Sequence, residues 1–83
     1  MKVEILTPED LIYQGEVSLI QLPGLDGLFE ILNNHAPMIT VLSEGNVKLV
    51  ETNNSPVFFT IKGGVVEVLA NKVLVLAENC KRK

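Results

Sequence analysis

The sequence predicts an all-β protein, a two-sheet β-sandwich of about eight to ten short strands. Three observations support this fold class. Polar and apolar residues alternate over several short segments, which is the pattern of a half-buried strand. Turn-forming glycine, proline, asparagine and aspartate residues separate these segments at close intervals. No segment long enough for a helix shows the 3.6-residue period of an amphipathic helix.

The length and composition indicate one domain with a small core. A chain of 83 residues buries roughly 60–65% of the surface that it exposes when unfolded. Hydrophobic residues make up 47% of the chain, which argues against disorder. The net charge is −3, and the aromatic residues are one Tyr and three Phe, so neither the charge nor the stacking surface favours nucleic-acid binding.

The cysteine count and the N-terminus indicate an intracellular soluble domain. The single cysteine, Cys80, cannot form an internal disulfide, whereas small secreted domains usually contain several. The N-terminal segment lacks the apolar core of a signal peptide, and no stretch approaches the ~20 apolar residues of a membrane span. These absences are compatible with a peripheral place on a membrane complex.

The first third of the chain is predicted to form short strands with one irregularity. Alternation predicts strands at residues 2–5, 11–13 and 16–22. Gly15 permits a bend or a bulge between two of them. The alternation slips by one residue at 20–22, which indicates either a bulge or a strand that is buried on both faces.

Residues 23–37 interrupt this series with a tight turn, a brief strand and a shaped loop. The segment contains three turn signals: Pro23-Gly24, Asp26-Gly27 and Asn33-Asn34. A short apolar run at 28–32 lies between them. The loop then presents His35-Ala36-Pro37, and loops on a rigid scaffold are where function often lies.

The next strands differ in how clearly they alternate. Residues 38–42 are apolar enough for a strand of buried type, and residues 43–46 form a turn. Residues 47–51 alternate only partly, and a polar loop follows at 52–56.

The C-terminal half predicts two successive hairpins. Gly63-Gly64 between residues 57–62 and 65–70 is a two-residue hairpin signal, which pairs Ile61 with Val66. Asn71-Lys72 is predicted to be a second such turn. One face then becomes wholly apolar: Val57, Phe59, Ile61, Val66, Val68, Ala70, Val73, Val75 and Ala77. The other face also carries large apolar residues, so part of it must be covered: Phe58, Leu69, Leu74 and Leu76. The domain is predicted to end at residue 77, before a charged tail at 78–83.

No group of residues supports catalysis or metal binding. His35 lacks a nucleophile in a recognisable pattern, and zinc would need several His or Cys ligands where the chain has one of each. The glycines do not form a phosphate-binding loop. Residues 81–83 are most simply a solvated basic tail, and Cys80 an incidental exposed thiol. We therefore expect no catalytic residue, no metal and no cofactor.

The residues favour an interaction module with its contact at His35-Ala36-Pro37-Met38. A face left apolar by Phe58, Leu69 and Leu74 is a candidate second contact. Two alternatives stay open at this point. One is a small β-sandwich that binds a carbohydrate or another ligand, although such proteins usually expose a row of aromatic residues. The other is an enzyme fragment that uses His35 with Glu30 or Asp26.

In this order and spacing, the motifs resemble the N-terminal β-sandwich domain of the epsilon subunit of rotary ATP synthases. The resemblance covers nearly the whole chain and rests on five pieces: Leu6-Thr7-Pro8-Glu9, Tyr13-Gln14-Gly15-Glu16-Val17, the segment 22–37 with its His35-Ala36-Pro37, Gly63-Gly64-Val65-Val66-Glu67-Val68, and 71–77.

The resemblance implies a non-catalytic rotor subunit of the central stalk, which couples the gamma shaft to the membrane c-ring during ion-driven ATP synthesis. It implies that His35, Ala36, Pro37 and Met38 face gamma. It implies that Asp26, Gly27, Leu28 and Glu30 face the polar loops of the c-ring. The expected location is peripheral, on the cytoplasmic face of a bacterial inner membrane.

Two departures from the family pattern affect these expectations. The family often has an acidic residue where this chain has Leu28 and a glycine where it has Glu30, so the carboxylate near the ring is expected at position 30. Most members continue into a C-terminal helical hairpin that inhibits ATP hydrolysis and in some bacteria helps to bind ATP. Only six residues follow Ala77, so we expect no such brake and no ATP site of that kind.

Overall fold

The computed structural model describes residues 1–83 and contains nine β-strands and no helix. The all-β prediction is confirmed, and the strand number lies in the predicted range. The strands are β1 (Lys2–Leu6), β2 (Leu11–Gly24), β3 (Gly27–Leu32), β4 (Met38–Leu42), β5 (Gly45–Glu51), β6 (Pro56–Ile61), β7 (Gly64–Leu69), β8 (Lys72–Ala77) and β9 (Lys81–Arg82). The structure has no helix long and apolar enough to cross a membrane.

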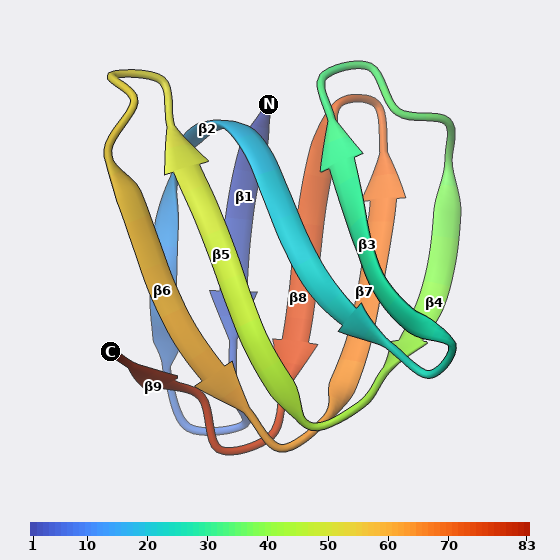
Figure 1. Cartoon of the computed structure of the whole chain (residues 1–83), viewed down its shortest axis with the longest axis vertical. Coiled ribbons are helices and arrows are strands. Elements are labelled where there is room, and N and C mark those ends of the chain that lie inside the picture. Colours follow the sequence, from blue (N-terminus) through green and yellow to red (C-terminus); the bar gives the residue numbers. More distant parts are fainter.

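The long strand β2 belongs to both layers of the sandwich (Figure 1). Its first half pairs with β1, and its second half pairs with β3 and β5. One layer therefore contains β4, β7, β8, β1 and the start of β2, and the other contains β3, the end of β2, β5, β6 and β9. The layers enclose a core of 19 buried apolar residues.

A β-bulge lies where β2 passes between the layers. Val17 pairs with Glu51 and Leu19 with Val50, so Ser18 is an extra residue in the ladder. Its hydroxyl donates a hydrogen bond to the Val50 carbonyl at 3.2 Å. The bulge shifts the inward-facing phase by one residue, which buries both Val17 and Ile20. Of the two explanations for the slip in alternation, the bulge is correct, although it precedes residue 20.

Gly15 does not separate two strands, contrary to one expectation from the sequence. It lies inside the continuous strand β2 and pairs with Val3. A Cβ atom at this position would lie 2.7 Å from the Tyr13 hydroxyl oxygen. A side chain at position 15 would therefore require the Tyr13 phenol ring to shift.

Of the three turns predicted in residues 23–37, the one at Asp26-Gly27 is present and connects β2 to β3. Pro23-Gly24, by contrast, is not a turn. Pro23 and Gly24 continue β2, and Gly24 pairs directly with Gly27. Leu25 and Asp26 make the connection, and Gly27 has a φ of 123° that favours glycine.

The prediction that 38–42 is a strand of buried type is wrong for one of its faces. In β4, Leu42 faces the core, but Ile39 is 70% exposed and Val41 is 53% exposed. The prediction failed because apolar character alone does not show whether a side chain faces the core or the outside.

The predicted Gly63-Gly64 hairpin is also wrong. β6 pairs with β5 and β9, whereas β7 pairs with β4 and β8. The glycines carry the chain from one layer to the other, with φ angles of 140° and 151° that differ from those of a tight hairpin turn. The nine residues predicted on one apolar face are buried except Ala70, but they face each other across the core from two layers.

The second predicted hairpin is present and lies one residue earlier than expected. β7 and β8 are joined by Ala70 and Asn71, which have φ angles of 51° and 60°. Positive φ at both turn positions is the mark of a type I′ hairpin turn. Ala70 is exposed because it belongs to this turn rather than to the strand.

Residues 78–83 are not simply a solvated tail. Lys81 and Arg82 form β9 against β6, and the Lys83 amide donates to the Phe58 carbonyl at 2.9 Å. The Arg82 guanidinium lies 5.9 Å from the centre of the Phe59 ring. Cys80, expected to be exposed, is half-buried and packs against the core, and this burial raises the pKa of its thiol.

Tyr13 closes one side of the core and links the layers. Its hydroxyl donates a hydrogen bond of 2.6 Å to the Glu51 carboxylate, and its ring meets Phe59 edge-on at 5.8 Å. Burial, followed by the hydrogen bond and the charge of Glu51, raises the pKa of Tyr13 from 10.0 to about 12.

This raised pKa predicts a specific loss of stability at alkaline pH. Because the folded pKa exceeds the unfolded one, the contribution is complete below pH 10 and is lost as the pH rises toward about 12. Urea unfolding of the wild type and of Tyr13→Phe across this window measures the effect. The variant should be less stable at neutral pH and should lose less stability on alkalinisation. Parallel pH profiles for the two proteins would contradict the assignment.

Candidate functional site

The predicted gamma-facing loop lies at one end of the sandwich and is held by hydrogen bonds from other segments. It connects β3 to β4 and lies beside the β7–β8 turn, at the top of Figure 1. The Asn34 amide donates to the Asn71 side-chain oxygen at 2.7 Å. The Asn33 side chain accepts a hydrogen bond of 2.7 Å from the amino group of Met1. These contacts fix the loop on the scaffold although its residues are exposed.

The four predicted gamma-facing residues differ in exposure. His35, Ala36 and Pro37 are exposed, whereas Met38 is half-buried and packs against the core. The His35 amide donates to the Leu32 carbonyl at 3.2 Å, which closes the turn. Met38 therefore anchors the loop, and the three residues before it present their surface to the outside.

Three of the predicted ring-facing residues lie at the other end of β3, and the fourth, Glu30, lies near the middle of the strand. Asp26, Gly27, Leu28 and Glu30 are all exposed, and Leu28 is 65% exposed. β3 has six residues, so at about 3.3 Å per residue the turn and the His35 loop are separated by roughly 20 Å. The two predicted contact sites are thus on opposite ends of one sandwich.

This separation argues against a catalytic pair of His35 and Asp26. The His35 ring is exposed, and its one hydrogen bond is between Nδ1 and the Ala36 carbonyl, at 2.7 Å. Neither Asp26 nor Glu30 forms a hydrogen bond or an ion pair with it. No group of His, Cys, Asp and Glu is placed to hold a metal ion.

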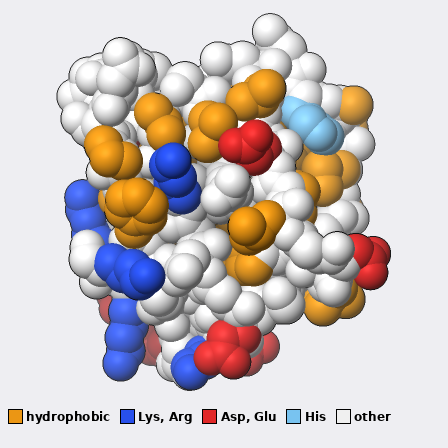
Figure 2. Space-filling model, viewed as in Figure 1, with side chains coloured by type: hydrophobic (Ala, Val, Ile, Leu, Met, Phe, Trp, Pro, Cys, Tyr) orange, Lys and Arg blue, Asp and Glu red, His pale blue; other side chains and the backbone are white.

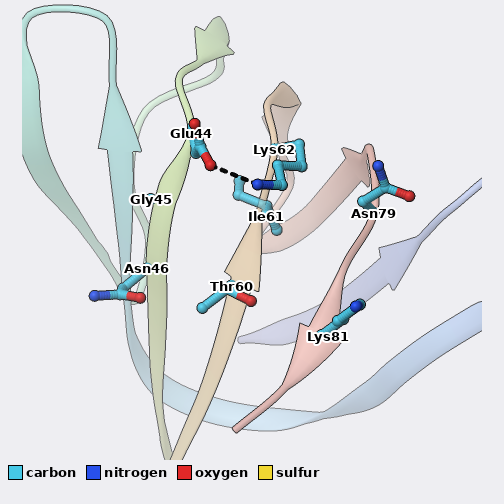
Figure 3. Close-up of a pocket in the computed structure, with 8 residues that line it drawn as sticks. All are labelled: Glu44, Gly45, Asn46, Thr60, Ile61, Lys62, Asn79 and Lys81. Carbon is cyan, nitrogen blue, oxygen red and sulfur yellow. Dashed lines mark hydrogen bonds and ion pairs between the residues drawn. The ribbon is translucent and has the colours of Figure 1, made fainter.

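A surface hollow between the β4–β5 turn, β6 and the start of β9 contains an ion pair (Figure 3). Lys62 Nζ lies 2.8 Å from Glu44 Oε2, and both side chains are exposed. This hydrogen bond lowers the pKa of Glu44 and raises that of Lys62. The other polar residues of the hollow form no bond with this pair in Figure 3: Asn46, Thr60, Asn79 and Lys81. An exposed ion pair of this kind is a surface feature with little effect on stability.

Positive charge gathers on one side of the molecule. Lys and Arg side chains lie together at the left of the view in Figure 2, on the side that β6 and β9 form. Five of the seven positively charged residues lie in or directly after strands β5, β6 and β9: Lys48, Lys62, Lys81, Arg82 and Lys83. Asp26 and Glu30 lie on β3 and its turn, and β2 separates β3 from Lys48 of β5, the nearest of these basic residues in the strand order.

The structure reveals a further exposed apolar surface that the sequence did not indicate. Ile39, Val41, Val65 and Leu76 are 70%, 53%, 36% and 49% exposed. Val41 pairs with Val65, and Val65 pairs with Leu76, so three of the four form a row across β4, β7 and β8. We call these four residues the outer apolar face. This face adjoins the His35 loop, because β4, which carries Ile39 and Val41, begins at Met38, directly after that loop.

The three residues predicted to form a second contact do not share one face of the sandwich. Leu69 and Leu74 lie in the layer of the outer apolar face, but Phe58 is on β6 in the other layer. The error follows from the wrong hairpin, which placed β6 and β7 side by side. The signal that would have identified Ile39 and Val41 is that β4 has apolar residues on both of its faces, which is unexpected for a strand with a solvated face.

The sequence matches the family described as the beta-sandwich domain of the delta/epsilon chain of ATP synthase over residues 1–83. This chain belongs to that family. The ATP synthase epsilon chain of Chlorobium limicola is 44% identical over 78 residues, a match that covers 94% of this chain and 89% of the relative. The epsilon chain of Chlorobaculum tepidum is 41% identical over 76 residues, which are 92% of this chain and 86% of the relative. The epsilon-type resemblance seen in the sequence is therefore confirmed.

Other members of the delta/epsilon family are longer than this chain. It spans 60% of the epsilon chain of Sulfurimonas denitrificans, at 42% identity. Among solved structures, a chain of the mitochondrial ATP synthase of Euglena gracilis superposes with a TM-score of 0.91 at 17% identity, which shows a shared fold. A chain from the central stalk and c-ring of the Tetrahymena thermophila enzyme superposes with a TM-score of 0.80 at 25% identity. This chain covers 51% and 65% of those two chains, respectively.

Proposed function

We propose that this chain is a central-stalk subunit of a rotary ATP synthase, without chemistry of its own, that couples the gamma shaft to the membrane c-ring. The observation that carries the proposal is the position of the two predicted contact sites at opposite ends of one rigid sandwich. Transmission of torque requires a body that deforms little between its two contacts. A close-packed core, here with no buried side-chain polar atom left unpaired, meets that requirement.

The gamma contact in this proposal consists of the His35 loop and the outer apolar face. His35, Ala36 and Pro37 are exposed, and Met38 leads directly into β4, so the loop and Ile39 form one continuous surface. Exposed apolar residues that adjoin one another across strands are typical of protein–protein contacts. Burial of this face against gamma would explain why β4 is apolar on both of its faces.

The c-ring contact consists of the β2–β3 turn and the start of β3. Asp26 and Glu30 supply carboxylates there, with Gly27 and Leu28 between them, and all four are exposed. Carboxylates away from the basic β6–β9 side suit a partner with basic loops, because complementary charge guides association and fixes orientation.

We further propose how this chain relates to the control of ATP hydrolysis and where it lies in the cell. Within residues 1–83 there is no helical hairpin that could restrain ATP hydrolysis. The Chlorobium limicola and Chlorobaculum tepidum relatives, which this chain covers to 89% and 86%, support a short form of the subunit. As part of the complex, the chain would be peripheral to the cytoplasmic face of a bacterial inner membrane.

Isothermal titration calorimetry with the gamma subunit of the same organism tests the function. We expect one-to-one binding of the wild type and binding about tenfold weaker for His35→Glu, because a carboxylate would be desolvated in the contact. Thr52→Glu, in the exposed β5–β6 loop, is the matched control and should bind as the wild type does. No binding by a folded wild-type chain would refute the gamma-coupling role.

A further inference from the structure

Glu67 places a carboxylate beside the outer apolar face, in the same cross-strand row as Glu4 of β1, which is paired with Lys72. It lies on β7, is exposed, and pairs opposite Ile39 of β4 and Leu74 of β8. Directly paired residues of neighbouring strands project on the same side of a sheet. The carboxylate is therefore flanked on both sides by apolar side chains, next to the row formed by Val41, Val65 and Leu76.

Glu67 forms no ion pair within the chain. The three ion pairs of the chain involve the carboxylates of Glu16, Glu44 and Glu4. Lys72 of β8 lines the same hollow as Glu67, but its ammonium group lies 3.5 Å from a Glu4 carboxylate oxygen. Glu67 also accepts no side-chain hydrogen bond within the chain, so in the free protein its carboxylate is solvated by water.

A partner that covers this face removes that water. An ionised carboxylate that is desolvated without a counter-charge is costly, whereas one that meets a hydrogen-bonded cation is not. We propose that the partner surface carries an Arg or Lys that pairs with Glu67, surrounded by apolar side chains. This inference rests on the proposed function, in which gamma is the partner that covers the face.

The geometry favours arginine for that position. A guanidinium can bind both carboxylate oxygens at once and is more weakly hydrated than an ammonium group, so it loses less on transfer into an apolar contact. A single charge pair within an apolar surface also sets the register of docking, because any shifted arrangement leaves both charges unpaired. Glu67 would thus fix how the sandwich is oriented on gamma.

Calorimetry with gamma and variants at position 67 tests the inference. We expect Glu67→Gln to bind about tenfold more weakly and Glu67→Lys more than about 100-fold more weakly than the wild type. The matched control is Glu44→Lys, an exposed position in the turn between β4 and β5 with the same change of charge, which should bind as the wild type does. Thermal melts of each variant verify that the fold is retained.

A charge-reversal screen on the partner identifies the cation. Each exposed Arg and Lys of gamma is replaced by Glu and titrated against Glu67→Lys. One reversal should restore binding to within about tenfold of the wild-type pair, because the charges are then exchanged. Unchanged affinity of Glu67→Lys, or no restoring reversal, would overturn the inference and leave gamma binding by the wild type intact. A wild-type chain that does not bind gamma would instead refute the proposed function itself.

Discussion

Replacement of Ile39 with aspartate is expected to weaken binding of the gamma subunit by about 100-fold or more. Ile39 is the most exposed residue of the outer apolar face, at 70%, and it adjoins both the His35 loop and Glu67. Aspartate there would remove apolar contact area and place a second carboxylate beside Glu67. Substitutions of this kind at the centre of a contact typically cost about 2–4 kcal/mol, which is a factor of roughly 30–1,000 in affinity.

The folded state itself should tolerate Ile39→Asp, because the side chain is exposed in the free chain. Calorimetric titration with gamma measures the affinity, and urea unfolding verifies stability. Phe58→Asp is the matched control, since Phe58 is an apolar residue, 40% exposed, on β6 of the other layer. Equal weakening by both substitutions would show that the effect is not specific to the outer apolar face.

The pattern of burial could be predicted from the sequence, but the pairing of strands could not. Alternation correctly placed Phe59, Ile61, Val66 and Val68 inside, because an inward position has the same signature in every strand. It does not specify which strand lies alongside. Gly63-Gly64 fits a hairpin turn and also fits a crossing between layers, and only the tertiary structure shows that the crossing is used.

The candidate site likewise contains features that the local sequence marks and features that arise only from strand pairing. The His35 loop and the Asp26–Gly27 turn could be predicted because glycine, proline and asparagine mark turns locally. The outer apolar face could not, because it consists of residues from β4, β7 and β8 that come together only when the strands pair. Similarly, β9 could not be predicted, since two charged residues gain their strand conformation only from the edge of β6.

Substitution of Gly64 with alanine is expected to destabilise the domain by about 3 kcal/mol or more. Gly64 is the first residue of β7 and pairs with both Leu42 and Ala77. A Cβ atom there would overlap the carbonyl oxygen of Leu76 and lie 3.0 Å from the Ala77 Cα. Because both atoms belong to the backbone of β8, relief requires the ladder between β7 and β8 to open. The φ of 151° adds conformational strain for any residue with a side chain.

Gly63→Ala is the control that isolates the close approach from the backbone strain. Gly63 also has a positive φ, of 140°, but the nearest atom to an added Cβ is the Leu42 carbonyl oxygen at 3.6 Å, an ordinary contact. Its substitution should therefore cost only the strain, about 1–3 kcal/mol. Urea unfolding of both variants gives the difference in free energy. In a two-residue hairpin turn, alanine at either glycine would lower the free energy of unfolding by a similar amount. A clearly larger decrease for Gly64→Ala is therefore expected only if the chain crosses between layers here. Equal decreases for the two variants would contradict that crossing.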